Sequence, residues 1–251
     1  MAFVDLNCDL GESFGRYTLG LDDQVIPLIT SANVACGMHA GDPVVMAQSV
    51  ERCVAAGVAI GAHPGYPDLQ GFGRRDMNLS AEEAYAFVLY QVSALAGFCQ
   101  ANGAKLHHVK PHGQLYNRAA KDEVLANAIA RAVRDFDSDL VLVGLAGSCL
   151  IQAGRGLGLR TAGEFFADRN YQPDGSLVPR SQPNAVIANE DEAVARTVEA
   201  VKSGIVTASD GSQVAVDFDT ICVHGDGPQA LAFVNRIRAA LSAAGVEIKA
   251  I

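Results

Sequence analysis

The sequence has no surplus of basic residues and no hydrophobic run long enough to cross a membrane. Its 19 Lys and Arg are outnumbered by 28 Asp and Glu, for a formal net charge of -9. This charge disfavours binding to nucleic acid or anionic lipid, because both need basic patches. The start of the chain also lacks the basic and apolar segments of a secretory signal. We therefore expect a cytoplasmic protein that binds small molecules or other proteins.

Paired cysteine motifs are also missing. The six cysteines are scattered without a CxxC pair: Cys8, Cys36, Cys53, Cys99, Cys149 and Cys222. Several lie in apolar segments, where a thiol behaves as a small hydrophobic group. We predict that all six are reduced and structural.

Nucleotide-binding loops and domain linkers are absent as well. The nearest glycine-rich string, Gly154 to Gly158, is predicted to follow a helix as a cap and turn, instead of linking a strand to a helix as phosphate loops do. The sequence has no internal repeat and no linker rich in Pro, Gly or Ser. We predict one domain spanning residues 1–251.

What is present is an alternation of short apolar runs with longer amphipathic stretches, which is typical of repeated βα units. We expect strands at residues 3–7, 31–35, 58–62, 105–109, 140–144, 161–165 and 220–223, and helices at 42–57, 80–102, 122–136, 190–202 and 228–244. Seven parallel strands favour a closed β/α barrel. Residues 205–216, with Asp210-Gly211 at the turn, predict a small β-hairpin insertion before the last strand.

Polar residues are concentrated directly after the predicted strands. The carboxyl ends of parallel strands meet on one face of a barrel, so these residues should lie together there. Two long loops, 64–79 and 167–187, should contribute to the same face. A single histidine in such a place is more often a packed hydrogen-bonding group than a catalyst. The gathering of imidazoles, acids and a lysine is what predicts an active site, because uncompensated polar burial is costly.

These same segments resemble the LamB/YcsF family. The matching strings span residues 5–15, 31–43, 61–75, 109–117, 164–171, 177–183 and 222–226. They include DLNCDLGESFG at the first strand and VKPHGQLYN at the fourth. The strings occur in order along essentially the whole chain, and together they are highly specific.

The resemblance implies a seven-stranded barrel related to the glycoside hydrolase and deacetylase barrels. It also implies the ATP-dependent hydrolysis of the lactam 5-oxoproline to glutamate, with 5-oxoprolinase subunits B and C as partners. Because the chain lacks a P-loop, we expect the partners to bind ATP, although the sequence alone does not decide which subunit does so. It also leaves open whether the chain forms a homo-oligomer.

On this basis we assign two groups of candidate residues. The catalytic candidates are Asp9, Glu12, His39, His63, Lys110 and His112. The substrate-binding candidates are Asn7, Arg74, Glu164, Arg169, His224 and Asp226, with Arg75 and Arg180 in reserve. Imidazoles and carboxylates would activate water, while lysine and arginine would neutralise charge on the lactam oxygen or its phosphate.

Two alternatives stay open. In the first, Asp9, His39 and His63 bind a divalent metal in a sugar or amide deacetylase, although no HxxxH pair supports this. In the second, the chain is a non-catalytic subunit that only binds the lactam or scaffolds its partners. Loss of activity on adding a chelator would distinguish the first alternative from a metal-free reaction. Loss of complex assembly in variants of the site residues would distinguish the second from a catalytic subunit.

Overall fold

The computed structural model describes residues 3–223 and 228–251, which form the predicted closed barrel of seven parallel strands. The barrel strands are β1 (Phe3–Leu10), β2 (Ser31–Ala35), β3 (Ala59–His63), β4 (His108–Val109), β5 (Val141–Leu145), β6 (Arg160–Phe166) and β9 (Thr220–Val223). Pairing of β1 with β9 closes the barrel. A short strand that the sequence did not predict, β10 (Glu247–Ile248), pairs with the start of β1.

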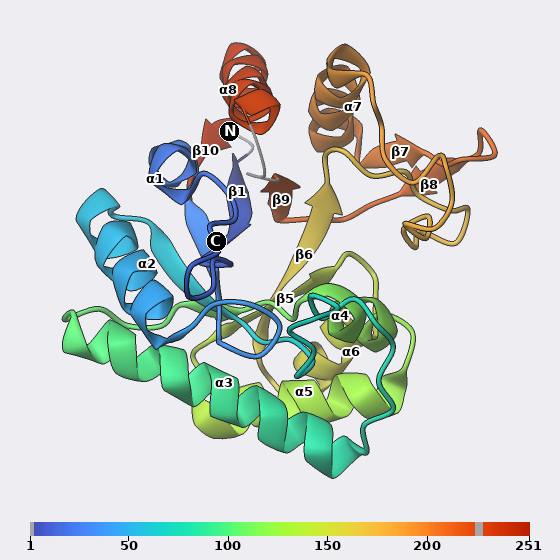
Figure 1. The fold of residues 1–251 in the computed structure, drawn as a ribbon. Coiled ribbons are helices and arrows are strands. Elements are labelled where there is room, and N and C mark those ends of the chain that lie inside the picture. The colour runs from blue at the N-terminus through green and yellow to red at the C-terminus, as the bar shows by residue number, and fades with distance from the viewer. Residues whose placement is uncertain (1–2, 224–227) are drawn as a thin grey trace.

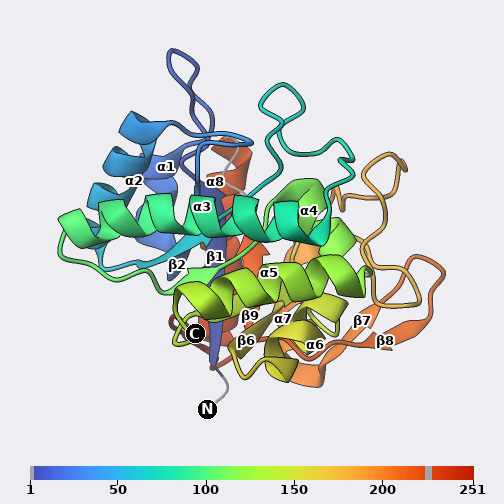
Figure 2. The same ribbon diagram turned by 90° about the horizontal axis from the view of Figure 1, so that it is seen from below.

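Helices surround the barrel (Figure 1), and Figure 2 shows α3 and α5 side by side along one flank. The helices are α1 (Asp22–Val25), the 3-10 helix η1 (Ile26–Leu28), α2 (Pro43–Ala56), α3 (Ala81–Ala101), α4 (Gly113–Ala119), α5 (Glu123–Phe136), α6 (Cys149–Gly156), α7 (Glu190–Ser203) and α8 (Pro228–Ala243). The predicted hairpin is present as β7 (Ile205–Thr207) and β8 (Gln213–Ala215), which pair antiparallel.

Local sequence signals set several helix boundaries. The Asp42 side chain accepts from the amides of Val44 and Val45 and caps α2. Ser80 and Glu83 form a capping box at the start of α3. Such caps satisfy amides that have no partner within the helix.

Other boundaries differ from the prediction. β1 continues through Leu10, three residues beyond the predicted end at Asn7, so Asp9 lies within the strand and not after it. β4 has only two residues. Gly154 and Gly156 lie inside α6, which corrects their predicted place in a turn after a helix. Helices α4 and α6 were not predicted because they have only seven and eight residues, and Gly154 within α6 also disfavours a helix.

Helix α3 qualifies the expectation that no segment could span a membrane. By length and composition, this 21-residue helix is apolar enough to cross one, the only such helix among the described residues. One face of it is buried and packs on α5 and β3. Buried Gln91 accepts from the Gly65 amide and donates to the Gly65 carbonyl. The helix therefore packs as part of the core, and core helices of soluble proteins pass the same test.

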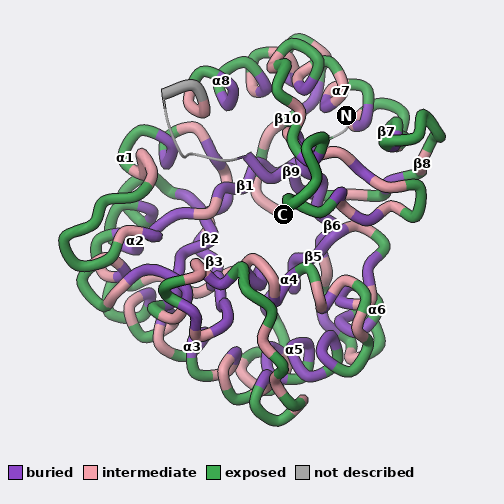
Figure 3. The backbone as a smooth tube through the Cα atoms, turned by 45° about the vertical axis from the view of Figure 1, so that its right-hand side comes forward, coloured by how far each residue is buried: buried purple, intermediate pink, exposed green. Residues whose placement is uncertain are grey.

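The barrel strands are largely buried (Figure 3), and several of their buried side chains are polar, among them Asp5, Ser31, Asn33, His108 and Thr220. At one level, the Asp5 carboxylate accepts from the hydroxyls of Ser31 and Thr220. His108 fills the lumen beside Asn33, with Nε2 2.8 Å from Oδ1. Gly61 makes room for this imidazole, because a Cβ there would lie 2.0 Å from His108 Nε2. These buried polar residues precede the candidate residues at the carboxyl ends of the same strands.

Candidate active site

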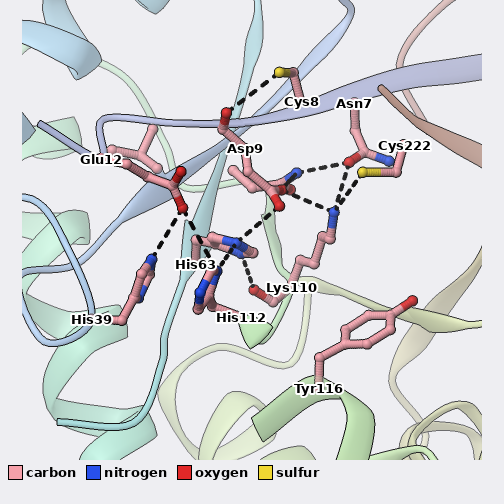
Figure 4. A network of polar contacts seen from close by, with 12 residues as sticks. Asn7, Cys8, Asp9, Glu12, His39, His63, Lys110, His112, Tyr116 and Cys222 are labelled. Atoms are coloured by element: carbon pink, nitrogen blue, oxygen red, sulfur yellow. Dashed lines mark hydrogen bonds and ion pairs between the residues drawn. The ribbon is translucent and has the colours of Figure 1, made fainter. Parts of the chain in front are cut away.

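The carboxyl ends of the strands bring six catalytic candidates and two substrate-binding candidates into one connected network (Figure 4). Its members are Asn7 and Asp9 in β1, Glu12 just after β1, His39 after β2, His63 at the end of β3, Lys110 and His112 after β4, and Glu164 in β6. The predicted gathering of these residues at one end of the barrel is thus present. Their individual roles stay predictions.

Lys110 lies at the centre of the network, with only 2% of its side chain exposed. Its Nζ is 2.9 Å from Asp9 Oδ1, 2.7 Å from Glu164 Oε1 and 3.1 Å from Asn7 Oδ1. Cys222 Sγ is a fourth neighbour at 3.3 Å. Three N–H donors therefore have protein acceptors around them already.

Charge pairing keeps this buried lysine protonated. Burial alone would lower the pKa of Lys110, but the negative charges of Asp9 and Glu164 outweigh it and raise the pKa well above its usual value. Glu164 also accepts a 2.7 Å hydrogen bond from the Tyr116 hydroxyl. The ammonium group thus acts as a fixed charge that orients Asp9.

Beside Asp9, the rings of three histidines pack against one another, and Glu12 lies next to them. The His39 and His112 rings stack with their centroids 3.6 Å apart, and His63 meets both edge-on. His63 Nε2 lies 3.2 Å from Asp9 Oδ2, and His39 Nε2 lies 3.3 Å from Glu12 Oε1. Burial lowers the pKa of His39 well below its usual value and that of His112 to about 3. Both imidazoles are therefore neutral at neutral pH.

A strained loop holds His112 in place. Phe72 has φ 55°, and among the described residues it is the one non-glycine with a left-handed backbone. Its carbonyl accepts from His112 Nε2 at 2.8 Å. The next residue, Gly73 at φ 61°, allows close approach, since a Cβ there would lie 2.8 Å from His112 Cδ2. Strain of this kind persists only where the surrounding structure imposes it.

A cavity opens over the network and is lined by residues from the strand ends and from both long loops. The lining comprises Asp9, Glu12, His63, Phe72, Arg74, Lys110, Pro111, His112, Gly113, Tyr116, Asn117, Phe166, Arg169, Leu177 and Arg180. His39 does not reach the cavity because it is fully buried beneath the others. The lining thus combines two acids and two imidazoles with three arginines.

A second cavity adjoins the first and shares Arg74, Arg169 and Arg180 with it. Arg169 is buried, and its guanidinium donates to the carbonyls of Val178 and Ala185. Burial, together with the nearby charge of Arg180, lowers the pKa of Arg169 to about 10. The three guanidiniums give the boundary between the cavities a positive charge suited to a carboxylate or a phosphate.

The remaining predictions have mixed outcomes. Arg74 and the reserve residue Arg180 line the cavity, whereas Arg75 pairs with Asp68 outside it. His224 and Asp226 lie outside the described residues. Sequence reasoning did not select the cavity residues Phe72, Tyr116, Asn117, Phe166 and Leu177. All five stand within the quoted family strings, which were the available signal.

Fold and site together define a parallel β/α barrel with a small-molecule cavity at the carboxyl ends of its strands. The model of the LamB/YcsF family matches residues 4–251, and the chain belongs to that family.

Its relatives cover the whole chain. It is 64% identical over 250 residues to a protein of Tolumonas auensis that is named as the A subunit of 5-oxoprolinase, with 100% of both chains covered. A protein of the same name from Bacillus subtilis is 55% identical over 248 residues, covering 99% of this chain and 96% of the relative. The crystal structure of a lactam utilization protein from Thermus thermophilus superposes with a TM-score of 0.94 at 49% identity, covering 99% of this chain and 100% of that one.

Proposed function

We propose that this chain is the A subunit of an ATP-dependent 5-oxoprolinase, which hydrolyses 5-oxo-L-proline to L-glutamate together with subunits B and C. The names of its relatives support this assignment. The observation that carries it for this chain is the cavity itself, which is lined by acids, imidazoles and arginines, with the arginines also lining the adjoining cavity. That combination of groups suits a small lactam that also bears a carboxylate.

The substrate has two groups that need different surroundings. Its carboxylate would bind on the arginine side, where Arg169 and Arg74 line the cavity, because guanidinium groups bind carboxylates in a bidentate manner. Its lactam carbonyl would then face Asp9, His63 and His112 on the opposite side. The phosphate acquired from ATP would lie near Arg180, at the boundary with the second cavity.

The chemistry needs activation because an amide is stabilised by resonance. In our scheme the γ-phosphoryl group of ATP is transferred to the lactam oxygen. Water then attacks the ring carbon, and the C–N bond breaks as the nitrogen takes up a proton. The resulting acyl phosphate is hydrolysed by a second water to glutamate and phosphate.

The side chains of the network would divide these tasks. Asp9 and Glu12, with the imidazoles of His63 and His112, would orient the attacking water and accept its proton. Lys110 would be a positioning residue, since its donors already face Asp9, Glu164 and Asn7. It would hold the Asp9 carboxylate towards His63 and keep its charge compensated.

The test is ATP-dependent release of glutamate from 5-oxoproline by the purified chain mixed with subunits B and C. Replacing His112 by Asn should lower turnover by about 10²–10⁴-fold, while size-exclusion chromatography still shows the assembled complex. His107→Gln is the matched control, because His107 lies outside the cavity lining, and it should keep normal turnover. Normal turnover in His112→Asn would contradict the proposal, and loss of assembly would favour the scaffolding alternative.

A second candidate is hydrolysis assisted by a metal ion, and one specific observation favours it. Glu12, His39, His63 and His112 each offer one potential ligand atom, and these atoms all lie within 4.8 Å of one another. This differs from the set expected from the sequence, which contained Asp9 in place of Glu12 and His112.

A further inference from the structure

Two imidazole nitrogens of the site face each other in a way that a hydrogen bond between neutral rings cannot explain. His63 Nε2 and His112 Nδ1 lie 3.0 Å apart. His63 Nδ1 is 2.7 Å from the Lys110 carbonyl, and His112 Nε2 is 2.8 Å from the Phe72 carbonyl. A carbonyl oxygen only accepts, so each of these nitrogens carries the ring proton. With both rings in the neutral form, the two facing nitrogens would therefore each carry a lone pair.

Acceptor atoms of two carboxylates surround the same point. Glu12 Oε1 lies 3.6 Å from His112 Nδ1, and Asp9 Oδ2 lies 3.2 Å from His63 Nε2. Two imidazole nitrogens and two carboxylate oxygens, all of them atoms that can bind a metal, thus lie around one point, and a cation placed among them would relieve the repulsion between their lone pairs.

We propose that Glu12 Oε1, His63 Nε2 and His112 Nδ1 bind a divalent transition-metal cation of the zinc class. Metal–ligand distances of about 2.0–2.2 Å in a tetrahedral site separate neighbouring ligand atoms by roughly 3.3 Å. The separations of 3.0 Å and 3.6 Å between these atoms bracket that value. Two imidazoles and one glutamate form the donor set of hydrolytic zinc sites, which keep a fourth position open.

The surroundings are those of metal ligands. Histidines that bind metals almost always donate their other N–H to a carbonyl or carboxylate, which fixes the ring. His63 and His112 do so to Lys110 and Phe72, the latter through a strained backbone. His39 is assigned to an outer role, since its Nε2 reaches Glu12 while its buried Nδ1 has no hydrogen-bond partner within residues 3–223 and 228–251.

The open coordination position would face the substrate. Glu12, His63 and His112 all line the cavity, whereas His39 does not. Asp9 also lines it, and its Oδ2, 3.2 Å from His63 Nε2, would lie beside the ion as a base for bound water. A cation there would polarise that water.

The experiment measures metal binding to the chain alone, with no lactam, ATP or partner protein present. Chelator-stripped protein is titrated with Zn²⁺ by calorimetry, and Co²⁺ is added separately to record its visible spectrum. We expect one ion per chain and the intense Co²⁺ bands of a four-coordinate site. His63→Ala and His112→Ala should weaken binding by about 100-fold or more, while the matched control His107→Gln should bind as the wild type does.

Circular dichroism checks that each variant is folded, and Glu12→Gln serves as the milder change if a histidine variant unfolds. Glu12→Gln keeps the size of the side chain and removes the anionic ligand, so it too should weaken binding. The proposal is overturned if the wild type binds no stoichiometric ion, or if the folded site variants bind as tightly as His107→Gln. Since neither result depends on turnover, failure here and failure of the proposed lactam hydrolysis are distinguishable.

Discussion

Lys110 Nζ lies 2.7 Å from Glu164 Oε1 inside the barrel, and the two side chains are 2% and 0% exposed. A buried ion pair adds little net stability, but removing one partner leaves an uncompensated charge in a medium that solvates it poorly. Replacing either Lys110 or Glu164 alone should therefore destabilise the fold.

Replacing Lys110 by Met should lower the free energy of unfolding by about 3–5 kcal/mol, because Asp9 and Glu164 would lose their shared counter-charge. The double variant Lys110→Met/Glu164→Gln should recover part of that loss. Urea denaturation followed by circular dichroism measures both. Equal stability of Lys110→Met and the wild type would show that the pair is not buried as described.

Gly73 should not tolerate a side chain. In Gly73→Ala the new Cβ would lie 2.8 Å from both His112 Cδ2 and His39 Cβ, so the stacked imidazoles must move. The matched control is Gly57→Ala, which has a similar φ of 69° but no atom within 4 Å of the new Cβ. We expect Gly73→Ala to lose about 1–3 kcal/mol more than the control and most of the activity, as measured by denaturation and by glutamate release.

Acid should destabilise the fold through His108. Burial lowers the pKa of His108 well below its usual 6.5, so the folded state favours the neutral ring. The contribution of a depressed pKa is present above 6.5 and is lost as pH falls below it. A His108→Gln variant should therefore lose less stability between pH 6.5 and 5, by up to about 1.4 kcal/mol per pH unit. Urea denaturation with a chelator present measures this, and the two curves should run parallel above pH 7.5.

Arg180 should bind the anionic part of the substrate. It is exposed at the boundary of the two cavities, so Arg180→Gln should leave the stability unchanged. Loss of one charge-assisted hydrogen bond should lower kcat/KM for 5-oxoproline or ATP by about 10-fold or more. Steady-state kinetics in the three-subunit mixture measures the effect, and the substrate whose KM rises identifies the ligand of this arginine. Unchanged constants for both substrates would remove Arg180 from the site.

The sequence was sufficient for the barrel and for most of the network, because apolar periodicity marks strands and polar residues cluster after them. It could not show that His108 points into the lumen, since that depends on the missing side chain of Gly61 on a neighbouring strand. Nor could it predict that the Phe72 carbonyl holds His112, which follows from a backbone conformation rare for phenylalanine. It also treated Lys110 as available for the substrate, although three-dimensional packing surrounds its ammonium group with protein acceptors.

The pairing of β1 has a consequence for how the protein matures. This strand carries Asp9, yet one of its edges is completed only by β9, the last barrel strand to leave the ribosome, and by the short strand β10 that follows it. Until then the strand that carries Asp9 has no hydrogen-bonded neighbour along that edge. During synthesis, a nascent chain that stops short of Thr220 would expose an open sheet edge, which invites pairing with other chains.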